Sequence, residues 1–136
     1  MKKLSVVVIA LAFGVVFWSS ESLGAAASGS TQTVSGGGVA AKVTYLNPNS
    51  RNDLRFQVSL ETHSVLLDGY DLKSLALLRD DKGMSYPPTA VENKGGGHHR
   101  EIILTFSKVS SDAKTFKVVI KDVAGVKERV FSWSVE

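Results

Sequence analysis

Apolar and polar residues alternate along most of the chain after residue 38. The clearest case runs from Leu54 to Leu60, where Phe56 and Val58 continue an apolar series and the residues between are polar. Successive side chains of a strand point to opposite faces, so this period of two predicts a strand with one buried face. From this pattern and from short apolar runs we predict about seven strands, at residues 39–45, 54–60, 75–78, 84–88, 102–106, 116–120 and 131–135.

Turn-forming residues separate these strands, and no stretch shows a sustained helical period. The segments 47–53 and 68–71 are examples, because both are rich in Asn, Asp, Pro or Gly. Short strands with turns between them predict an all-β fold, an immunoglobulin-like antiparallel β-sandwich, with a small β-barrel as the alternative. The predicted core consists of Val43, Phe56, Val58, Leu60, Leu75, Leu77, Ile102, Leu104, Phe106, Phe116, Val118, Ile120, Phe131 and Trp133.

The N-terminal part of the chain has a different character. Two lysines precede an apolar run at 4–18 and small residues follow it, which predicts a secretory signal peptide at 1–24. The run is shorter than the roughly 20 residues of a membrane-spanning helix, and an uncleaved N-terminal anchor is the alternative. Residues 25–38 are mostly Ala, Ser, Thr and Gly and are predicted to form a flexible linker. The β-sandwich domain is then expected at 39–136.

Composition limits the kinds of binding partner and, with the N-terminal segment, the cellular location that can be expected. The chain has 136 residues, a formal net charge of +3 and no cysteine. Without cysteine, the fold cannot use disulfides, thiolate ligands, a cysteine nucleophile or a lipid anchor on cysteine. The basic residues are dispersed, so no nucleic-acid partner is expected. The signal peptide predicts export to the periplasm or the extracellular space, with no membrane span after its cleavage.

The three histidines are the candidate chemistry. His98 and His99 lie in the stretch Gly-Gly-Gly-His-His-Arg-Glu at 95–101, and His63 follows the second predicted strand. In an immunoglobulin-like order the second and fifth strands are antiparallel neighbours in one sheet. The end of one then lies beside the start of the other, so we expect all three histidines at one end of the sandwich.

Two interpretations of this stretch remain open. Imidazole binds copper and zinc, which predicts a metal site formed by His63, His98 and His99. Glycines before the pair allow both rings to reach one side, and Glu61, Arg100 and Glu101 are candidates to complete or support the ligand set. In the alternative interpretation the stretch is a turn, its histidines bond to main-chain groups, and Arg100 pairs with an acidic residue.

No motif predicts catalysis. His63 and Ser64 are adjacent, but adjacency is not the geometry of a nucleophile and its base, and no Gly-x-Ser-x-Gly motif is present. The acidic turns at 68–71 and 80–83 lack the alternating oxygen ligands of a calcium loop. We therefore predict a binding protein that is not an enzyme. The alternative is an immunoglobulin-like module that binds an envelope protein through a sheet edge or loop.

Two motifs, with a third segment at 125–133, carry a resemblance to a known group of proteins. The motifs are Thr62-His63-Ser64-Val65 and Gly96-Gly97-His98-His99-Arg100. They resemble an uncharacterised family of small exported bacterial and archaeal domains, and the resemblance covers nearly all of 39–136. It implies a β-sandwich fold and export, and it marks residues 62–64 and 97–100 as signature positions. It implies no particular activity.

Overall fold

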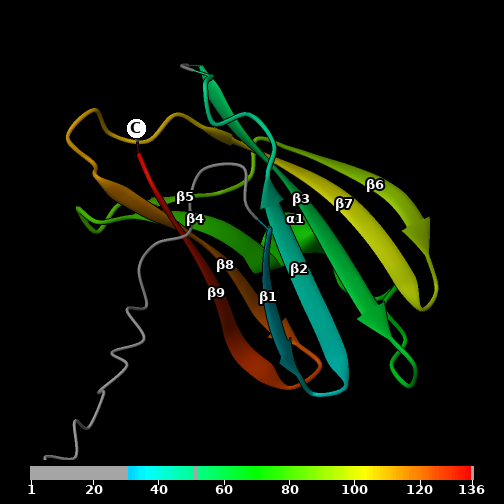
Figure 1. The fold of residues 1–136 in the computed structure, drawn as a ribbon. Coiled ribbons are helices and arrows are strands. Elements are labelled where there is room, and N and C mark those ends of the chain that lie inside the picture. The colour runs from blue at the N-terminus through cyan, green and yellow to red at the C-terminus, as the bar shows by residue number, and fades with distance from the viewer. Residues whose placement is uncertain (1–30, 51, 136) are drawn as a thin grey trace, which may run out of the picture.

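A computed structural model of the chain describes residues 31–50 and 52–135. The predicted signal peptide and residues 25–30 lie outside these ranges. The described chain forms nine strands and one helical turn (Figure 1). The strands are β1 (Thr31–Gly36), β2 (Val39–Tyr45), β3 (Asp53–Thr62), β4 (Ala76–Asp80), β5 (Ser85–Tyr86), β6 (Ala90–Gly96), β7 (His99–Ser107), β8 (Thr115–Val123) and β9 (Val126–Ser134), and the turn is α1 (Leu72–Leu75).

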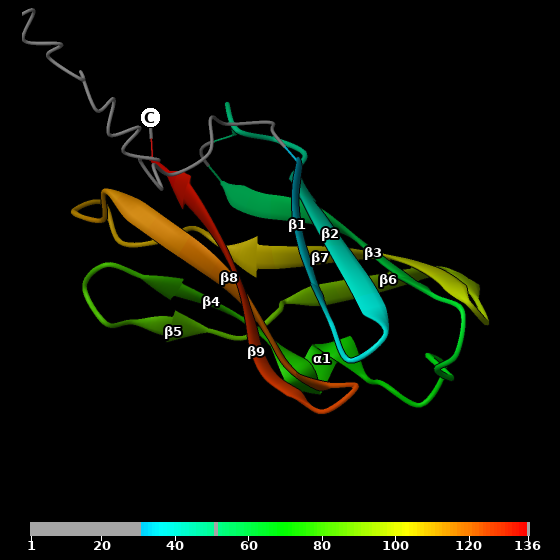
Figure 2. The ribbon, with the colours of Figure 1, turned by 60° about the horizontal axis from the view of Figure 1, so that its bottom comes forward.

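The strands form two antiparallel sheets that pack face to face (Figure 2). One sheet has the order β1-β2-β3-β7-β6 and the other has the order β5-β4-β8-β9. If β2 is taken as the first strand of an immunoglobulin-type domain and the two-residue β5 is left out of the count, β6 is the fourth strand and β7 the fifth. The first, second, fifth and fourth strands then form one sheet and the third, sixth and seventh form the other, which is the immunoglobulin order. The predicted sandwich is therefore confirmed, and the sheets do not close into a barrel. The two strands beyond the predicted seven are β1 and β6.

Strand β1 corrects the predicted linker. Its residues, Thr-Gln-Thr-Val-Ser-Gly, pair with β2 along their whole length, so the linker prediction is wrong for 31–38. Few apolar residues are needed there, because an edge strand is held mainly by main-chain bonds to its neighbour. Gly37 and Gly38 form the turn between β1 and β2 with φ of 62° and 80°. At Gly37 a Cβ would lie 2.1 Å from the carbonyl oxygen of Ala124, so only glycine fits.

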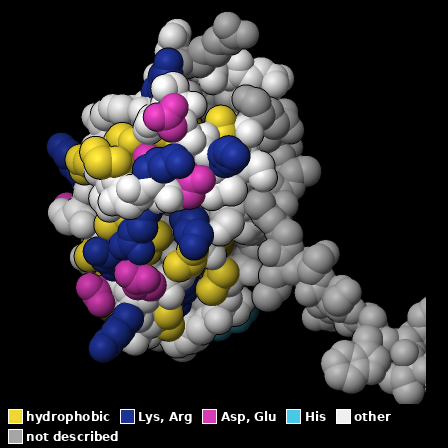
Figure 3. All heavy atoms as spheres, turned by 90° about the vertical axis from the view of Figure 1, so that its left-hand side faces the viewer, with side chains coloured by type: hydrophobic (Ala, Val, Ile, Leu, Met, Phe, Trp, Pro, Cys, Tyr) yellow, Lys and Arg dark blue, Asp and Glu magenta, His cyan; other side chains and the backbone are white. Residues whose placement is uncertain are grey.

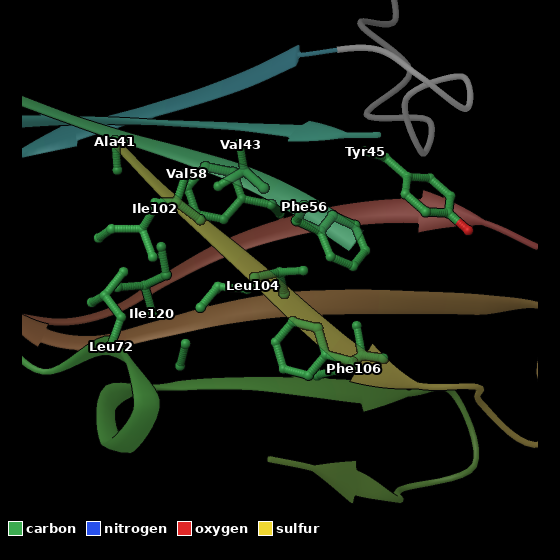
Figure 4. Close-up of a cluster of buried hydrophobic side chains, with 14 of the residues drawn as sticks. Ala41, Val43, Tyr45, Phe56, Val58, Leu72, Ile102, Leu104, Phe106 and Ile120 are labelled. Atoms are coloured by element: carbon green, nitrogen blue, oxygen red, sulfur yellow. The ribbon is translucent and has the colours of Figure 1, made fainter. Parts of the chain in front are cut away.

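The core lies between the sheets and is rich in aromatic rings. Twelve of the fourteen predicted core residues are buried, and Val43, Phe56 and Leu104 point between the sheets in Figure 4. The ring of Trp133 lies 5.1 Å from that of Phe56, measured between centroids. The exceptions are two leucines of the third predicted strand, Leu75 and Leu77, which are half-buried.

The third predicted strand differs in phase from β4, and its first residue, Leu75, belongs to α1. The N-terminal cap of α1 is Asp71, whose side chain accepts a hydrogen bond from the Lys73 N–H at 3.0 Å. The turn buries Leu72, and the strand that follows it buries Ala76 and Leu78. A continuous apolar run does not reveal which alternate residues face the core, so sequence alone could not set this phase.

The hairpin between β4 and β5 is organised by Asp80, which is buried. Its carboxylate accepts hydrogen bonds from the main-chain N–H groups of Lys82 and Met84, each at 2.9 Å, and from the Tyr86 hydroxyl at 2.9 Å. Burial alone would raise the pKa of Asp80, but these hydrogen bonds outweigh it and hold that pKa below its ordinary value. The pKa of Tyr86 is raised by burial and by its bond to the carboxylate.

Candidate functional site

The three histidines lie at one end of the five-stranded sheet, as the fold argument predicts. Strand β3 ends beside the start of β7, where Glu61 faces His99 and the Thr62 N–H donates to the carbonyl oxygen of His98 at 3.0 Å. All three histidines line one open hollow of about 550 Å³. The rest of its lining comes from β1, β2 and the end of β3: Ser35, Gly36, Gly38, Val39, Ala40, Glu61 and Thr62.

His99 lies between two carboxylates. Its Nδ1 is 3.5 Å from Glu61 Oε1, and its Nε2 is 3.6 Å from Glu101 Oε1. The alternation of β7 and its register with β3 place these three side chains on the outer face of the sheet. Glu61 also pairs with Lys42 at 3.3 Å. The His99 side chain is 58% exposed, so its ring is accessible to a ligand from solvent.

Thr62 organises the main chain around His63. Its hydroxyl donates to the carbonyl oxygen of Gly38 at 2.8 Å and accepts from the N–H groups of Ser64 and Val65 at 3.2 and 3.1 Å. One side chain thus ties the turn between β1 and β2 to the loop that carries His63. Sequence reasoning missed this role, although a threonine that ends a strand before a polar residue is a known local capping pattern.

Arg100 faces away from the predicted metal site and does not line the hollow. Alternation along β7 turns it to the inner face, opposite to His99, and it is only 8% exposed. Its guanidinium donates to the carbonyl oxygens of Leu67, at 2.9 Å, and Tyr70, and to Asn93 Oδ1 at 2.8 Å. Its expected acidic partner is therefore replaced by main-chain carbonyls and an amide. Arg100 holds the loop 63–71 against the sheet.

The turn between β6 and β7 is tied to the same loop. Asp68 Oδ1 accepts a hydrogen bond from the Gly97 N–H at 3.1 Å. Gly97 has a φ of 72°, which favours glycine, and His98 follows it directly. Asp68 and Arg100 together fix the position of both segments that carry histidines.

No metal site is preformed in the described chain. Across residues 31–50 and 52–135, no group of three or more His, Asp or Glu side chains is arranged to hold a metal ion. A three-histidine site would therefore require the exposed rings to rotate about their side-chain bonds. Such rotation is open to His63, His98 and His99, because all three are exposed.

Comparisons with known proteins leave the function open. No family model matches the chain. No curated protein matches it either. Among solved structures it is similar to a DUF4426 family protein from Pseudomonas aeruginosa PAO1, with 15% sequence identity and a TM-score of 0.47 over 76% of this chain and 93% of that chain. A likeness at this level carries neither fold nor function to this protein, and the resemblance of the motifs stays a prediction.

A second buried arginine lies near the hollow. Arg129 of β9 is 0% exposed and donates to the carbonyl oxygens of Val123 at 2.7 Å and Gly36 at 2.6 Å. Its Nε has no hydrogen-bond partner, and Arg129 forms no ion pair with a carboxylate of the described residues. Burial lowers the pKa of Arg129. This residue joins the two sheets below the hollow and was not identified from sequence.

The charge on the surface is mixed. Figure 3 shows basic and acidic side chains interspersed on the side that carries β4, β5, β8 and β9. Within the part of the chain that the structure describes, no helix is both long and apolar enough to cross a membrane.

Proposed function

We propose that this protein is an exported binding domain, not an enzyme, whose histidine end takes up Cu(II) or Zn(II). The observation that supports the proposal is that the three histidines, which are all that the sequence contains, line one open hollow. Histidine is a common ligand for both metals at neutral pH. Export is supported by the apolar N-terminal run with its two preceding lysines.

Two carboxylates favour a cation here: Glu61 lines the hollow, and Glu101 contacts His99 from outside that lining. Glu61 and Glu101 already lie within 3.6 Å of the nitrogens of His99. After rotation of the ring, either carboxylate can serve as a ligand or can orient the imidazole by accepting its free N–H. Thr62 and Arg100 tie the segments that carry His63 and His98 to the rest of the fold.

The test is calorimetric titration of the chain from residue 25 with Cu(II) and with Zn(II). We expect about one equivalent of metal to bind, and the variant His98→Ala/His99→Ala to lose that binding. His63→Ala reports whether the third ring takes part, and Glu61→Gln should weaken binding by roughly tenfold. Glu128→Gln, on β9 and away from the hollow, is the matched carboxylate control. Absence of binding heat above that of the buffer would contradict the proposal.

An interaction module of an envelope assembly is the second candidate function, and the exposed strand β6 favours it. Six of the seven residues of β6 are exposed, and among the described strands β6 pairs only with β7. Unpaired edge strands accept an additional strand from another chain. A photo-crosslinker at position 94 should capture a partner in intact envelopes, whereas one at position 130 of β9 should not. Equal capture at both positions would contradict this candidate.

A further inference from the structure

The four sheet edges differ in how far they are protected. On one side of the sandwich, the edges β1 and β9 lie together (Figure 2). The Gln32 side chain donates to the carbonyl oxygen of Ser132 and accepts from the Ser132 N–H at 3.1 Å, so it takes the place of a neighbouring strand. On the other side, β5 has two residues and leads into Pro87 and Pro88, which have no N–H. Among the edge strands that the structure describes, only β6 combines length with exposure.

The main-chain groups that β6 presents outward follow from the ladder. In antiparallel sheets the residues of an inner strand bond alternately to the neighbours on its two sides. The Thr62 N–H donates to the His98 carbonyl oxygen. In this register the main-chain N–H and C=O groups of the even-numbered residues of β7 point toward β3. The main-chain groups of the odd-numbered residues of β7 therefore bond to β6, where their partners include Glu92 and Lys94. The N–H and C=O groups of Val91 and Asn93 are left pointing outward.

The charges on β6 are self-complementary. Glu92 and Lys94 flank Asn93 on the outer face, with their charged atoms 3.8 Å apart and their side chains 60% and 53% exposed. The Asn93 side chain is turned inward to Arg100 and leaves the edge clear. If a second β6 pairs antiparallel with the first about Asn93, Glu92 of each copy faces Lys94 of the other. Opposite charges directly across an antiparallel pair stabilise it.

We propose that two copies of this chain associate through β6, in an antiparallel pair with its two-fold axis at Asn93, so that their five-stranded sheets join into one. The inference rests on the second candidate function, since it uses β6 as a docking edge, and it commits the partner to a second copy. The short ladder buries less surface than the roughly 1,200 Å² of a stable interface. The dimer is accordingly weak and sensitive to salt.

Charge reversal provides the test, by sedimentation of the chain from residue 25 at concentrations up to about 1 mM, where weak dimers populate. We expect the wild type to dimerise. E92K and K94E each replace two attractive pairs by two repulsive ones, so each alone should weaken dimerisation by roughly tenfold or more. An equimolar mixture of E92K with K94E restores both attractive pairs and should form heterodimers. Lys127→Glu, an exposed reversal on β9, is the matched control and should dimerise like the wild type.

Three results would contradict the proposed dimer. A wild type that is monomeric at every concentration overturns the self-pairing, as do single reversals that dimerise unchanged or a mixture that fails to restore association. If purified protein is monomeric but the crosslinker at position 94 captures a different envelope protein, the docking function stands and only the self-pairing fails.

Discussion

Replacing Arg100 by methionine tests the idea that this residue, and not a metal, orders the histidine end. Methionine keeps an unbranched stem in the interior but removes the guanidinium. The carbonyls of Leu67 and Tyr70 and the side chain of Asn93 then lose their donor. Hydrogen bonds that involve a charged group contribute about 1.5–3 kcal/mol each. Three bonds at the low end of that range amount to about 4–5 kcal/mol.

Relief of the buried charge offsets part of this loss, so we expect the free energy of unfolding to fall by about 2–4 kcal/mol. For a domain of this size the midpoint of thermal unfolding should fall by about 10–20 °C. Urea denaturation followed by fluorescence measures the change, because Trp133 is the only tryptophan after residue 24. Arg55→Met, an exposed change on β3, should alter stability by less than about 0.5 kcal/mol.

Hydrogen exchange adds a local readout. The amides of the loop 63–71 should lose protection in Arg100→Met even where the core strands remain protected. A loss of stability below about 1 kcal/mol, with loop protection unchanged, would refute the reasoning, since the guanidinium bonds would then not hold the loop.

Three further changes probe the rest of the fold. Because the pKa of Asp80 is held low, the ionised carboxylate stabilises the fold above its unfolded pKa of about 3.9, and this stabilisation is lost as pH falls through the folded pKa. In Asp80→Asn the free energy of unfolding, measured by urea titration, should therefore fall less steeply with decreasing pH. An unchanged dependence on pH would contradict this. Gly37→Ala should destabilise by more than about 2 kcal/mol in thermal unfolding, because its Cβ would meet the Ala124 carbonyl, whereas Gly83→Ala, with φ of 82° and open space, should cost only about 1 kcal/mol. The Trp133 indole N–H is buried without a hydrogen-bond partner. Trp133→Phe should therefore lower the free energy of unfolding by about 1–2 kcal/mol, well below the roughly 3–5 kcal/mol of Trp133→Ala. Equal losses for the two variants in calorimetry would contradict this.

Alternation in the sequence was enough to predict the sandwich and the neighbourhood of β3 and β7, because burial on one face imposes a period of two and the immunoglobulin order then fixes which strands pair. The same argument predicts that His63 lies beside His98 and His99, and all three line one hollow in the structure. It failed for β1, because an edge strand bonded through its main chain needs little apolar surface and so leaves little hydrophobic pattern.

The roles of the two buried arginines could not be predicted for a different reason. Arg100 and Arg129 donate mainly to main-chain carbonyls, and every residue has a carbonyl, so no residue type marks the acceptor. The partners of Arg100 in the loop are 30 and 33 residues away. The sequence does indicate that such arginines are buried, because each occupies a position on the face of its strand that is otherwise apolar. Arg129 interrupts the series that continues with Phe131 and Trp133.

The histidine hollow and the edge β6 should act independently. Gly96 faces His99 in the ladder, so the hollow lies at the far end of β6 from Ala90. An antiparallel pair about Asn93 sends the two hollows to opposite ends of the joined sheet, where neither copy reaches the histidines of the other. The metal affinity of the wild type, measured by the same calorimetry, should therefore agree within about a factor of two at protein concentrations below and above those at which it dimerises, since uncoupled sites bind independently. A tenfold difference would mean that the second copy contributes to the metal site, and the two-fold axis at Asn93 would then be wrong.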